Sequence, residues 1–225
     1  MSRLILASAS PRRRELLTQA GYVFEVQPAH VNEDLRPDED PIAYVVRLAR
    51  DKAQAVFNQL SNLGAPSPGS PSTAGTLRVR RGGGGLDSET WETTNSGPQS
   101  LIVLGADTTV TLDGHILAKP EDPADAARML RMLSGRTHRV ITGVAVATAN
   151  RTEVAAEVTG VQFLTLSEEE IAAYVATGEP MDKAGAYGIQ GRAAKWIPRV
   201  EGCYFNVVGL PLALVATMLD FSRWL

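Results

Sequence analysis

Apolar residues recur along this chain in two alternating patterns, one typical of strands and one typical of helices. Apolar runs and period-two alternation predict strands at 4–7, 101–104, 110–112, 138–148 and 153–166. Apolar residues spaced three or four apart predict helices that begin near 10, 40, 122 and 167, and a last helix at 211–224. Because helices and strands alternate, the sequence predicts an α/β fold with a mixed central sheet flanked by helices.

Turn and capping residues mark the ends of several of these elements. Ser10 followed by Pro11 predicts a helix start, and Asp113-Gly114 predicts a hairpin turn. The apolar run 101–104 is expected to end at Asp107, which would place this carboxylate at the carboxyl end of a strand, where open α/β sheets bind ligands. Asp107 would there hold a divalent cation or orient a water; the alternative is an Asx-turn that closes a loop.

One charged residue lies on the apolar stripe of the second helix. Lys52 follows Val45 by seven residues and precedes Val56 by four, so all three share a helix face. Such a lysine either extends its ammonium group out of the core or faces a cleft. The sequence leaves both arrangements open.

Residues 61–99 differ in composition from the rest of the chain. Of these 39 residues, 23 are Ser, Thr, Gly or Pro, and Trp91 is the one aromatic residue among them. A segment with so little apolar surface cannot offset its ordering entropy, so it is expected to be a disordered insertion. A linker between two domains is the alternative, but residues 1–60 are too few for an independent core. The prediction is one domain, 1–225, interrupted at 61–99.

Composition and charge narrow the class of protein. The chain is 44% hydrophobic and 21% charged, with no apolar run of the roughly 18 residues that a membrane helix needs. A net charge of −3 argues against a protein that binds duplex nucleic acid. Cys203 is the one cysteine, and the three histidines are far apart in sequence, which excludes a disulfide within the chain and a Cys-rich zinc site. The cytoplasm is the expected compartment, with an Arg-rich transit peptide at the N-terminus as the alternative.

The segment from Ser8 to Arg13 predicts an anion site. A strand here runs into a helix N-terminus, whose free N–H groups favour phosphate, and Arg12 and Arg13 add guanidinium groups. Cations in a first helical turn oppose the helix dipole, and a bound anion would relieve this. The alternative is a capped surface helix with solvated arginines.

Other polar candidates are less specific when each is considered alone. Lys119 would contact phosphate or be solvated, and Glu33 would bind a metal or be an exposed charge. The glycine-rich segment 182–191 would approach a ligand closely or be a flexible loop, and its Gln190 has both the donor and the acceptor that base recognition needs. Together, these cations and carboxylates indicate a polyphosphate substrate with Mg²⁺ or Mn²⁺.

The same residues fall in motifs that resemble Maf-type nucleoside triphosphate pyrophosphatases. The matching segments are LASASPRRRELL at 6–17, VVRLARDKA at 45–53, VLGADTTV at 103–110, LAKP at 117–120, the spaced residues from Met129 to His138, DKAGAYGIQG at 182–191 and NVVGLPL at 206–212. They cover nearly all of the chain except 61–99. GADT together with GIQG is similar to the branch that acts on dTTP and UTP.

The resemblance implies an elongated, two-lobed Maf/ITPase-like fold with a central cleft, a divalent metal and a homodimer. It implies hydrolysis of dTTP and UTP to the monophosphate and pyrophosphate, a housecleaning role in the nucleotide pool. By the resemblance, Asp107 is the proton acceptor, and Arg12, Thr108 and Gln190 govern base choice. The remaining matched residues are cleft residues Ser8, Arg13, Lys52, Lys119 and Lys183, and the metal-site residues Glu33 and Asp107.

Alternative functions remain open at this point. These are a 7-methyl-GTP pyrophosphatase of the sister branch, a phosphatase or sugar-nucleotidyl transferase, and a non-catalytic nucleotide-binding regulator of cell division.

The chain departs from the family pattern at 61–99, where relatives have a short connection. It departs again at Ala193 and Ala194, where the family often has glycine, and these alanines are expected to stiffen the loop after Gln190.

Overall fold

A computed structural model describes residues 2–63 and 100–220. The strands are β1 (Arg3–Leu6), β2 (Glu25–Val26), β3 (Leu101–Leu112), β4 (His115–Leu117), β5 (Thr137–Ala147), β6 (Thr152–Gln162) and β7 (Arg199–Glu201). The α-helices are α1 (Pro11–Gln19), α2 (Pro41–Leu63), α3 (Pro123–Leu133), α4 (Glu168–Val175), α5 (Tyr204–Val208) and α6 (Leu212–Met218). Three short 3₁₀ helices are η1 (Glu179–Asp182), η2 (Ala184–Ala186) and η3 (Arg192–Trp196).

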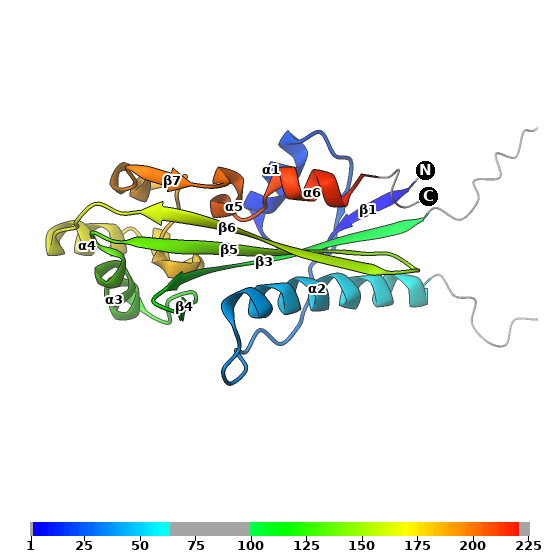
Figure 1. Cartoon of the computed structure of the whole chain (residues 1–225), viewed down its shortest axis with the longest axis horizontal. Coiled ribbons are helices and arrows are strands. Elements are labelled where there is room, and N and C mark those ends of the chain that lie inside the picture. The colour runs from blue at the N-terminus through cyan, green and yellow to red at the C-terminus, as the bar shows by residue number, and fades with distance from the viewer. Residues whose placement is uncertain (1, 64–99, 221–225) are drawn as a thin grey trace, which may run out of the picture.

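The strands form one mixed sheet of seven, which confirms the predicted α/β class. The order is β2-β1-β3-β5-β6-β7, with β4 paired to β3. β1 is parallel to β2 and β3, and the other pairs are antiparallel. The long strands β3, β5 and β6 run along the longest axis, with α3, α4 and β4 at one end and α1, α6 and β1 at the other (Figure 1).

One edge of β3 is left open in the middle of the sheet. β1 pairs with β3 only up to Leu104, and β4 pairs with it only from Val110 onward. On its other side β3 pairs with β5 continuously from Val103 to Thr111. Among the described residues, 105–109 therefore have a strand neighbour on one side only, and β1 and β4 are separated from each other along this edge of β3.

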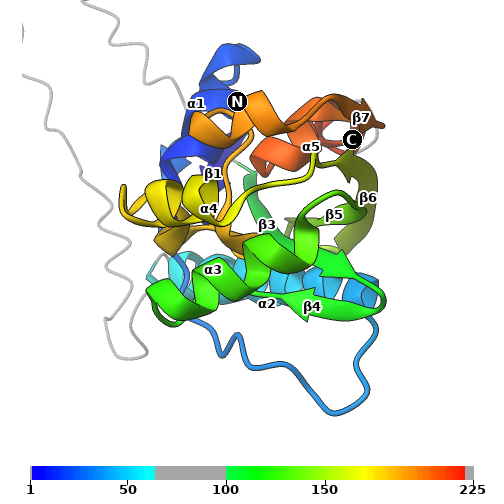
Figure 2. The ribbon, with the colours of Figure 1, turned by 90° about the vertical axis from the view of Figure 1, so that its left-hand side faces the viewer.

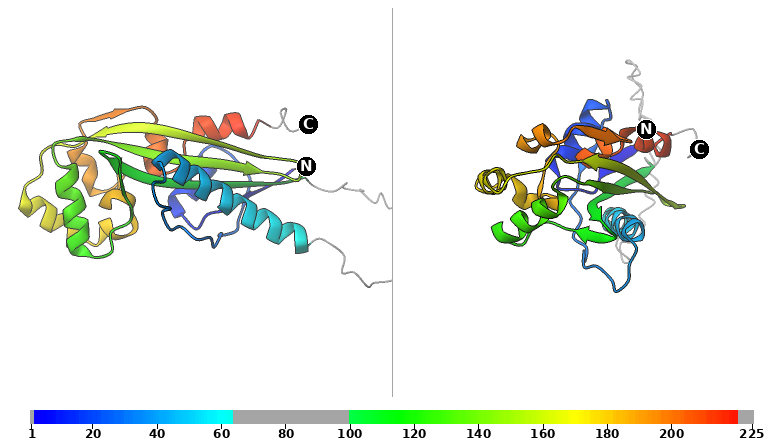
Figure 3. Two further views of the ribbon diagram at one scale, coloured as in Figure 1. Left: turned by 60° about the horizontal axis from the view of Figure 1, so that its bottom comes forward. Right: turned by 60° about the vertical axis from the view of Figure 1, so that its left-hand side comes forward.

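Helix α2 covers one face of this sheet at very close range. Gly105 and Gly143 lie under the helix, where a Cβ on either would overlap backbone atoms of α2, near Ala49 and Val45 respectively. Two glycines in neighbouring strands thus let the helix backbone approach the sheet. Figure 3 shows α2, coloured blue to cyan, lying along the strands.

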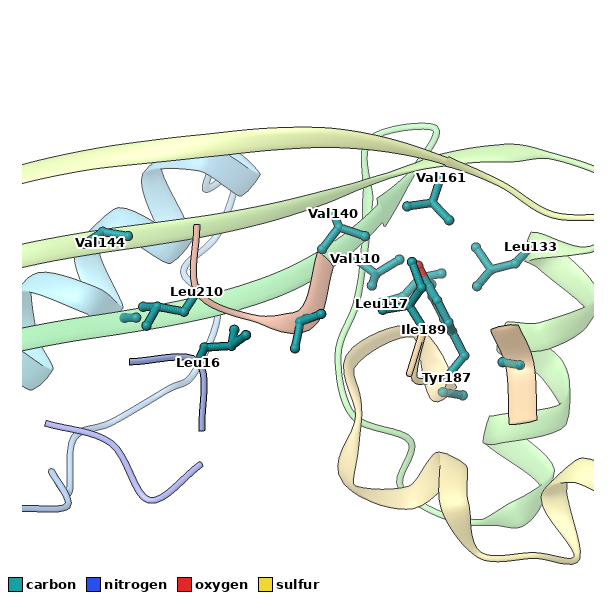
Figure 4. Close-up of a cluster of buried hydrophobic side chains, with 14 of the residues drawn as sticks. Leu16, Val110, Leu117, Leu133, Val140, Val144, Val161, Tyr187, Ile189 and Leu210 are labelled. Carbon is teal, nitrogen blue, oxygen red and sulfur yellow. The ribbon is translucent and has the colours of Figure 1, made fainter. Parts of the chain in front are cut away.

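The opposite face carries the larger core, to which α1, α3 and the C-terminal helices contribute. Figure 2 shows α3 and α4 at the end nearest the viewer, with the sheet behind them. In Figure 4, Tyr187 and Ile189 lie among the strand residues Val110 and Leu117, whereas Leu16 packs further along the sheet. The segment that contains Gln190 is therefore anchored by apolar side chains.

Several local predictions are confirmed. The side chain of Ser10 accepts a hydrogen bond from the N–H of Arg13 and caps α1. Asp113 and Gly114 adopt φ angles of 52° and 81°, as the predicted hairpin requires. The α2 stripe from Val45 to Val56 is buried, Lys52 included.

Other predicted boundaries are wrong. β3 does not end at Asp107 but continues to Leu112, because pairing with β5 extends the strand through this position. β6 ends at Gln162 rather than at 166, and α6 ends at Met218. Residues 221–224 of the predicted last helix lie outside the described residues.

The predicted insertion is described in part. α2 runs to Leu63, so residues 61–63 belong to that helix, and 64–99 lie outside the described residues. Within the described chain, no helix is both long enough and apolar enough to cross a bilayer.

Replacing Gly143 by alanine tests the close contact between α2 and the sheet. The added methyl group would overlap the α2 backbone at Val45, so we expect Gly143→Ala to lower the free energy of unfolding by more than about 3 kcal/mol. Gly160→Ala is the matched control, because its nearest neighbour would be Glu201 Cβ at 3.7 Å. Urea unfolding of both variants checks this, and equal losses would contradict it.

Candidate active site

A cavity of about 640 Å³ lies at the open edge of β3. Its walls come from both ends of the molecule. They include the segment after β1, the loop before α2, α2 itself, the middle of β3, the two residues after β4, the loop around η2 and the end of α5. It is lined by every predicted site residue, namely Ser8, Arg12, Arg13, Glu33, Lys52, Asp107, Thr108, Lys119, Lys183 and Gln190. The structure thus brings together residues that lie up to 182 positions apart in the sequence.

Lys52 faces this cavity rather than extending away from it. Its Nζ lies 2.7 Å from Asp107 Oδ1 and 2.6 Å from Glu33 Oε1, and the residue is 8% exposed. Partial burial acts to raise the pKa of Glu33, but Lys52, with Lys119 and Arg13, outweighs it and the net pKa is lowered. One ammonium group therefore joins the two carboxylates.

Two residues of α2 fix the loop that carries Glu33. The hydroxyl of Tyr44 donates to the Glu33 carbonyl at 2.9 Å, and Arg47 Nη2 donates to the Asp34 carbonyl at 3.0 Å. Arg47 also binds Glu39 and holds its pKa at about 2. Sequence reasoning missed Tyr44 and Arg47, although both lie next to the apolar stripe of a helix that bears a site residue.

Arg13 turns inward and closes the open edge of the sheet. Its Nη1 donates to the Ala106 carbonyl at 2.8 Å and to Ser8 Oγ at 3.2 Å. Its Nη2 donates to Thr108 Oγ1 at 2.9 Å, and its Nε donates to the Gly209 carbonyl at 2.8 Å. The Ala106 carbonyl has no strand partner on that side, so the guanidinium group takes the place of one. Burial lowers the pKa of Arg13, and the nearby Asp107 charge opposes this effect.

The hydroxyl of Thr108 belongs to a directed chain of hydrogen bonds. Thr142 Oγ1 has the Asn206 carbonyl as its acceptor at 3.2 Å, and it accepts from Thr108 at 2.9 Å, a shorter contact than the 3.4 Å from Thr108 to the Gly209 carbonyl. The order is therefore Arg13 to Thr108 to Thr142 to Asn206. Such a chain stiffens the floor of the cavity.

Arg12 differs from its neighbour in being more exposed. Its nearest acidic partner is Asp182, at 3.8 Å from Nη1, and its side chain is 36% exposed. The helix N-terminus thus combines one structural arginine with one that remains accessible to a ligand.

The loop that carries Gln190 is anchored to β5 by a buried histidine. His138 is 1% exposed, and its Nε2 lies 2.7 Å from the Tyr187 hydroxyl. Its Nδ1 has no hydrogen-bond partner among the described residues. Burial lowers the pKa of His138 from 6.5 to about 4, so the ring is neutral at pH 7.

The residues suited to a metal are two carboxylates. In residues 2–63 and 100–220, no three His, Cys, Asp or Glu side chains are grouped so that they could hold a metal ion together. Glu33 and Asp107 nevertheless converge on one point, since each has an oxygen within 2.7 Å of Lys52 Nζ. Two carboxylates plus substrate phosphates are the usual setting for Mg²⁺, so these residues fit a hard divalent cation.

Arg13→Lys tests the structural role of this arginine. A lysine has one nitrogen and cannot serve acceptors on three separate segments, so carbonyls such as Ala106 would lose their donors. We expect the free energy of unfolding to fall by about 2–4 kcal/mol. Arg12→Lys is the control for stability and should change it by less than about 0.5 kcal/mol. Urea unfolding checks both, and an unchanged Arg13→Lys midpoint would contradict the role.

The buried histidine predicts a pH dependence of stability. Its pKa is about 4 in the folded chain and about 6.5 in the unfolded chain, so the unfolded chain binds more protons between these values. His138 therefore lowers stability as the pH falls from 6.5 to 4, by up to about 3 kcal/mol. His138→Gln should show a smaller drop over this window.

Unfolding in urea at pH 7 and pH 4.5 measures this difference. His115→Gln is the matched control, because His115 is exposed and its replacement should leave the wild-type drop intact. The assignment would be wrong if wild type and His138→Gln lost the same stability.

Comparison with known proteins gives the family. The chain matches the Maf-like protein family over residues 3–221. A dTTP/UTP pyrophosphatase of Koribacter versatilis is 49% identical over 216 residues, 96% of this chain and 92% of that protein. Proteins of the same name from Salmonella typhimurium and Moorella thermoacetica are both 46% identical, over 98% and 97% of this chain and 93% and 94% of their own lengths. This chain therefore belongs to the Maf family.

Proposed function

We propose that this protein is a nucleoside triphosphate pyrophosphatase that hydrolyses dTTP and UTP to the monophosphate and pyrophosphate. The observation that carries the proposal is the meeting of Asp107, Lys52 and Glu33 at a cavity whose rim also bears Arg12, Lys119 and Lys183. The names of the relatives support the same activity and the same two substrates.

The cations of the cavity suit a triphosphate. Lys119 and Arg12 reach it from opposite ends of the molecule, and Lys183 lies on the loop beside them. Positive groups spread along the phosphate chain would neutralise the charge that develops on the leaving pyrophosphate. This favours cleavage between the α- and β-phosphates.

Asp107 is the proposed proton acceptor. A water attacks the α-phosphorus, its proton passes to the Asp107 carboxylate, and the bond from the α-phosphorus to the bridging oxygen breaks as pyrophosphate leaves. The hydrogen bond from Lys52 to Oδ1 orients the carboxylate within the cavity. Lys52 is held in turn by Glu33, so the two carboxylates act as one unit.

Glu33 and Asp107 are the residues that would hold Mg²⁺ or Mn²⁺, which supplies charge neutralisation at the phosphate oxygens when bound. The loop contacts of Tyr44 and Arg47 keep Glu33 facing Asp107.

Gln190 is the proposed direct reader of the base. Its amide can donate to a carbonyl oxygen of uracil or thymine and accept from the ring N–H. Thr108 is committed to the Arg13 chain, so we propose that it shapes the pocket floor. Arg12, the third residue assigned to base choice, lines the same cavity and lies 3.8 Å from Asp182, at the start of the segment that carries Gln190.

Three wider features belong to the same proposal: a single domain interrupted within 61–99, a homodimer and a cytoplasmic location. Light scattering of the pure protein tests the dimer, and fractionation of cells tests the location.

A substrate panel tests the proposed function. The pure protein is incubated with UTP, dTTP, CTP, GTP and 7-methyl-GTP, and pyrophosphate and orthophosphate are measured separately. We expect pyrophosphate from UTP and dTTP, with kcat/KM at least about 10-fold above that for CTP and GTP. Release of orthophosphate would indicate a phosphatase, and a preference for 7-methyl-GTP would indicate the sister branch.

Asp107→Asn tests the proton acceptor. The amide keeps the size of the side chain but cannot take a proton, so kcat should fall by roughly 10²–10⁴-fold. Asp113→Asn is the control, because Asp113 lies in the β3–β4 turn and pairs with Arg136. Retention of more than half of the wild-type rate at saturating metal would rule out this role for Asp107.

A further inference from the structure

We propose that Tyr174 and Glu179 are positioning residues for base recognition, because together they clamp the backbone on both sides of Gln190. The inference rests on the proposed function and concerns the selectivity of the site rather than the bond that breaks. Neither residue lines the cavity. Both act through the loop that does.

The clamp has one hydrogen bond before Gln190 and one after it. The N–H of Gly188 donates to the Tyr174 hydroxyl at 3.3 Å. The N–H of Arg192 donates to Glu179 Oε1 at 3.1 Å and is 3.4 Å from Oε2. The two halves are joined, since the Tyr174 hydroxyl donates to Glu179 Oε1 at 2.9 Å.

The donor and acceptor capacities of these groups fix the direction of each hydrogen bond in this network. The carboxylate of Glu179 has no hydrogen to give, so the Tyr174 hydroxyl must be the donor between them. That hydroxyl is then left as the acceptor for Gly188. Burial, together with the charge of Glu179, raises the pKa of Tyr174, so the phenol remains protonated and able to donate.

Close packing at Gly191 supports the clamp. A Cβ on Gly191 would overlap the Glu179 carboxylate, so only glycine allows that carboxylate to lie against the loop. The backbone carbonyl of Glu179 also accepts from Lys183 Nζ at 2.6 Å. One residue therefore ties down both a cation of the cavity and the segment that carries Gln190.

The ring of Tyr174 is held independently of its hydroxyl. It packs edge-to-face against Trp196, with ring centroids 5.1 Å apart, and Trp196 Nε1 donates to Glu170 at 3.1 Å. Tyr174→Phe therefore removes the hydrogen bonds and keeps the packing. This makes it the cleaner of the two variants.

The consequence for selectivity is geometric. An amide discriminates between bases only if it is held within about 0.5 Å of the productive position, because a small displacement exchanges paired groups for unpaired ones. Without the clamp, the N–H groups of Gly188 and Arg192 lose these partners, and Gln190 is held less firmly by the remaining anchors, the buried Tyr187 and Ile189. Such a displacement should lower kcat/KM most for the preferred base and least for the disfavoured bases.

The experiment compares kcat/KM for UTP with that for CTP and GTP in Tyr174→Phe and Glu179→Ala. We expect the UTP preference to fall by about 10-fold, mainly through a higher KM for UTP. A purely structural role would lower kcat/KM for all nucleotides alike and leave the ratio unchanged, which would overturn the proposal. Glu168→Gln is the control, because Glu168 lies on the same helix but pairs with Arg131 at the surface.

A second background identifies Gln190 as the residue through which the clamp acts. In Gln190→Ala, adding Tyr174→Phe should change the UTP preference by less than about 2-fold, because the group being positioned is already absent. The same 10-fold loss in both backgrounds would overturn the proposal. If Glu179→Ala fails to fold, Tyr174→Phe alone decides the outcome.

Measurements on the wild-type protein distinguish a failure of the proposed function from a failure of the positioning inference. A wild type that releases no pyrophosphate or does not prefer UTP contradicts the proposed function, and the positioning inference falls with it. A selective wild type whose variants remain selective contradicts the positioning inference only.

Discussion

The open edge of β3 is the constraint on which the rest of the structure depends. A strand edge in a sheet interior leaves carbonyl and N–H groups without partners, and such groups are costly unless something pairs with them. Here β1 ends at Leu6, opposite Leu104, and β4 pairs no further back than Val110, so the middle of β3 needs another donor. Arg13 provides it, and the chain around Arg13 and the turn at Gly209 become fixed relative to the sheet.

Successive side chains of β3 point to opposite faces of the sheet, so neighbouring cavity residues of this strand have different partners. Asp107 points to the α2 face, where Gly105 and Gly143 admit the helix closely enough for Lys52 to reach the carboxylate. Thr108, the next residue, points to the other face and joins the Arg13 chain. A substitution that moved α2 outward would therefore disturb the contact between Lys52 and Asp107 first, whereas one at Arg13 would disturb the opposite face of the sheet.

Local signals in the sequence predicted much of this, because they act over a few residues. The cap at Ser10, the turn at Asp113-Gly114 and the α2 stripe each follow from neighbours in the chain. The continuation of β3 past Asp107 did not follow, since it depends on pairing with β5 more than thirty residues away. The motifs named Arg13 as a cleft residue, but its acceptors come from segments distant in sequence, so its structural role could not be predicted.

The placement of Gln190 gives the proposed base reader a support separate from that of the proposed proton acceptor. Asp107 and the Lys52 that orients it lie on the central sheet and its helix, whereas Gln190 lies on a loop held by hydrogen bonds of two buried tyrosines. His138 and Tyr187 hold that loop to β5, and Tyr174 holds it to α4. The loop that carries Gln190 thus has its own supports, which do not include Asp107 or Lys52. If Gln190 reads the base as proposed, changes in those supports alter which base is preferred while Asp107 and Lys52 stay in place.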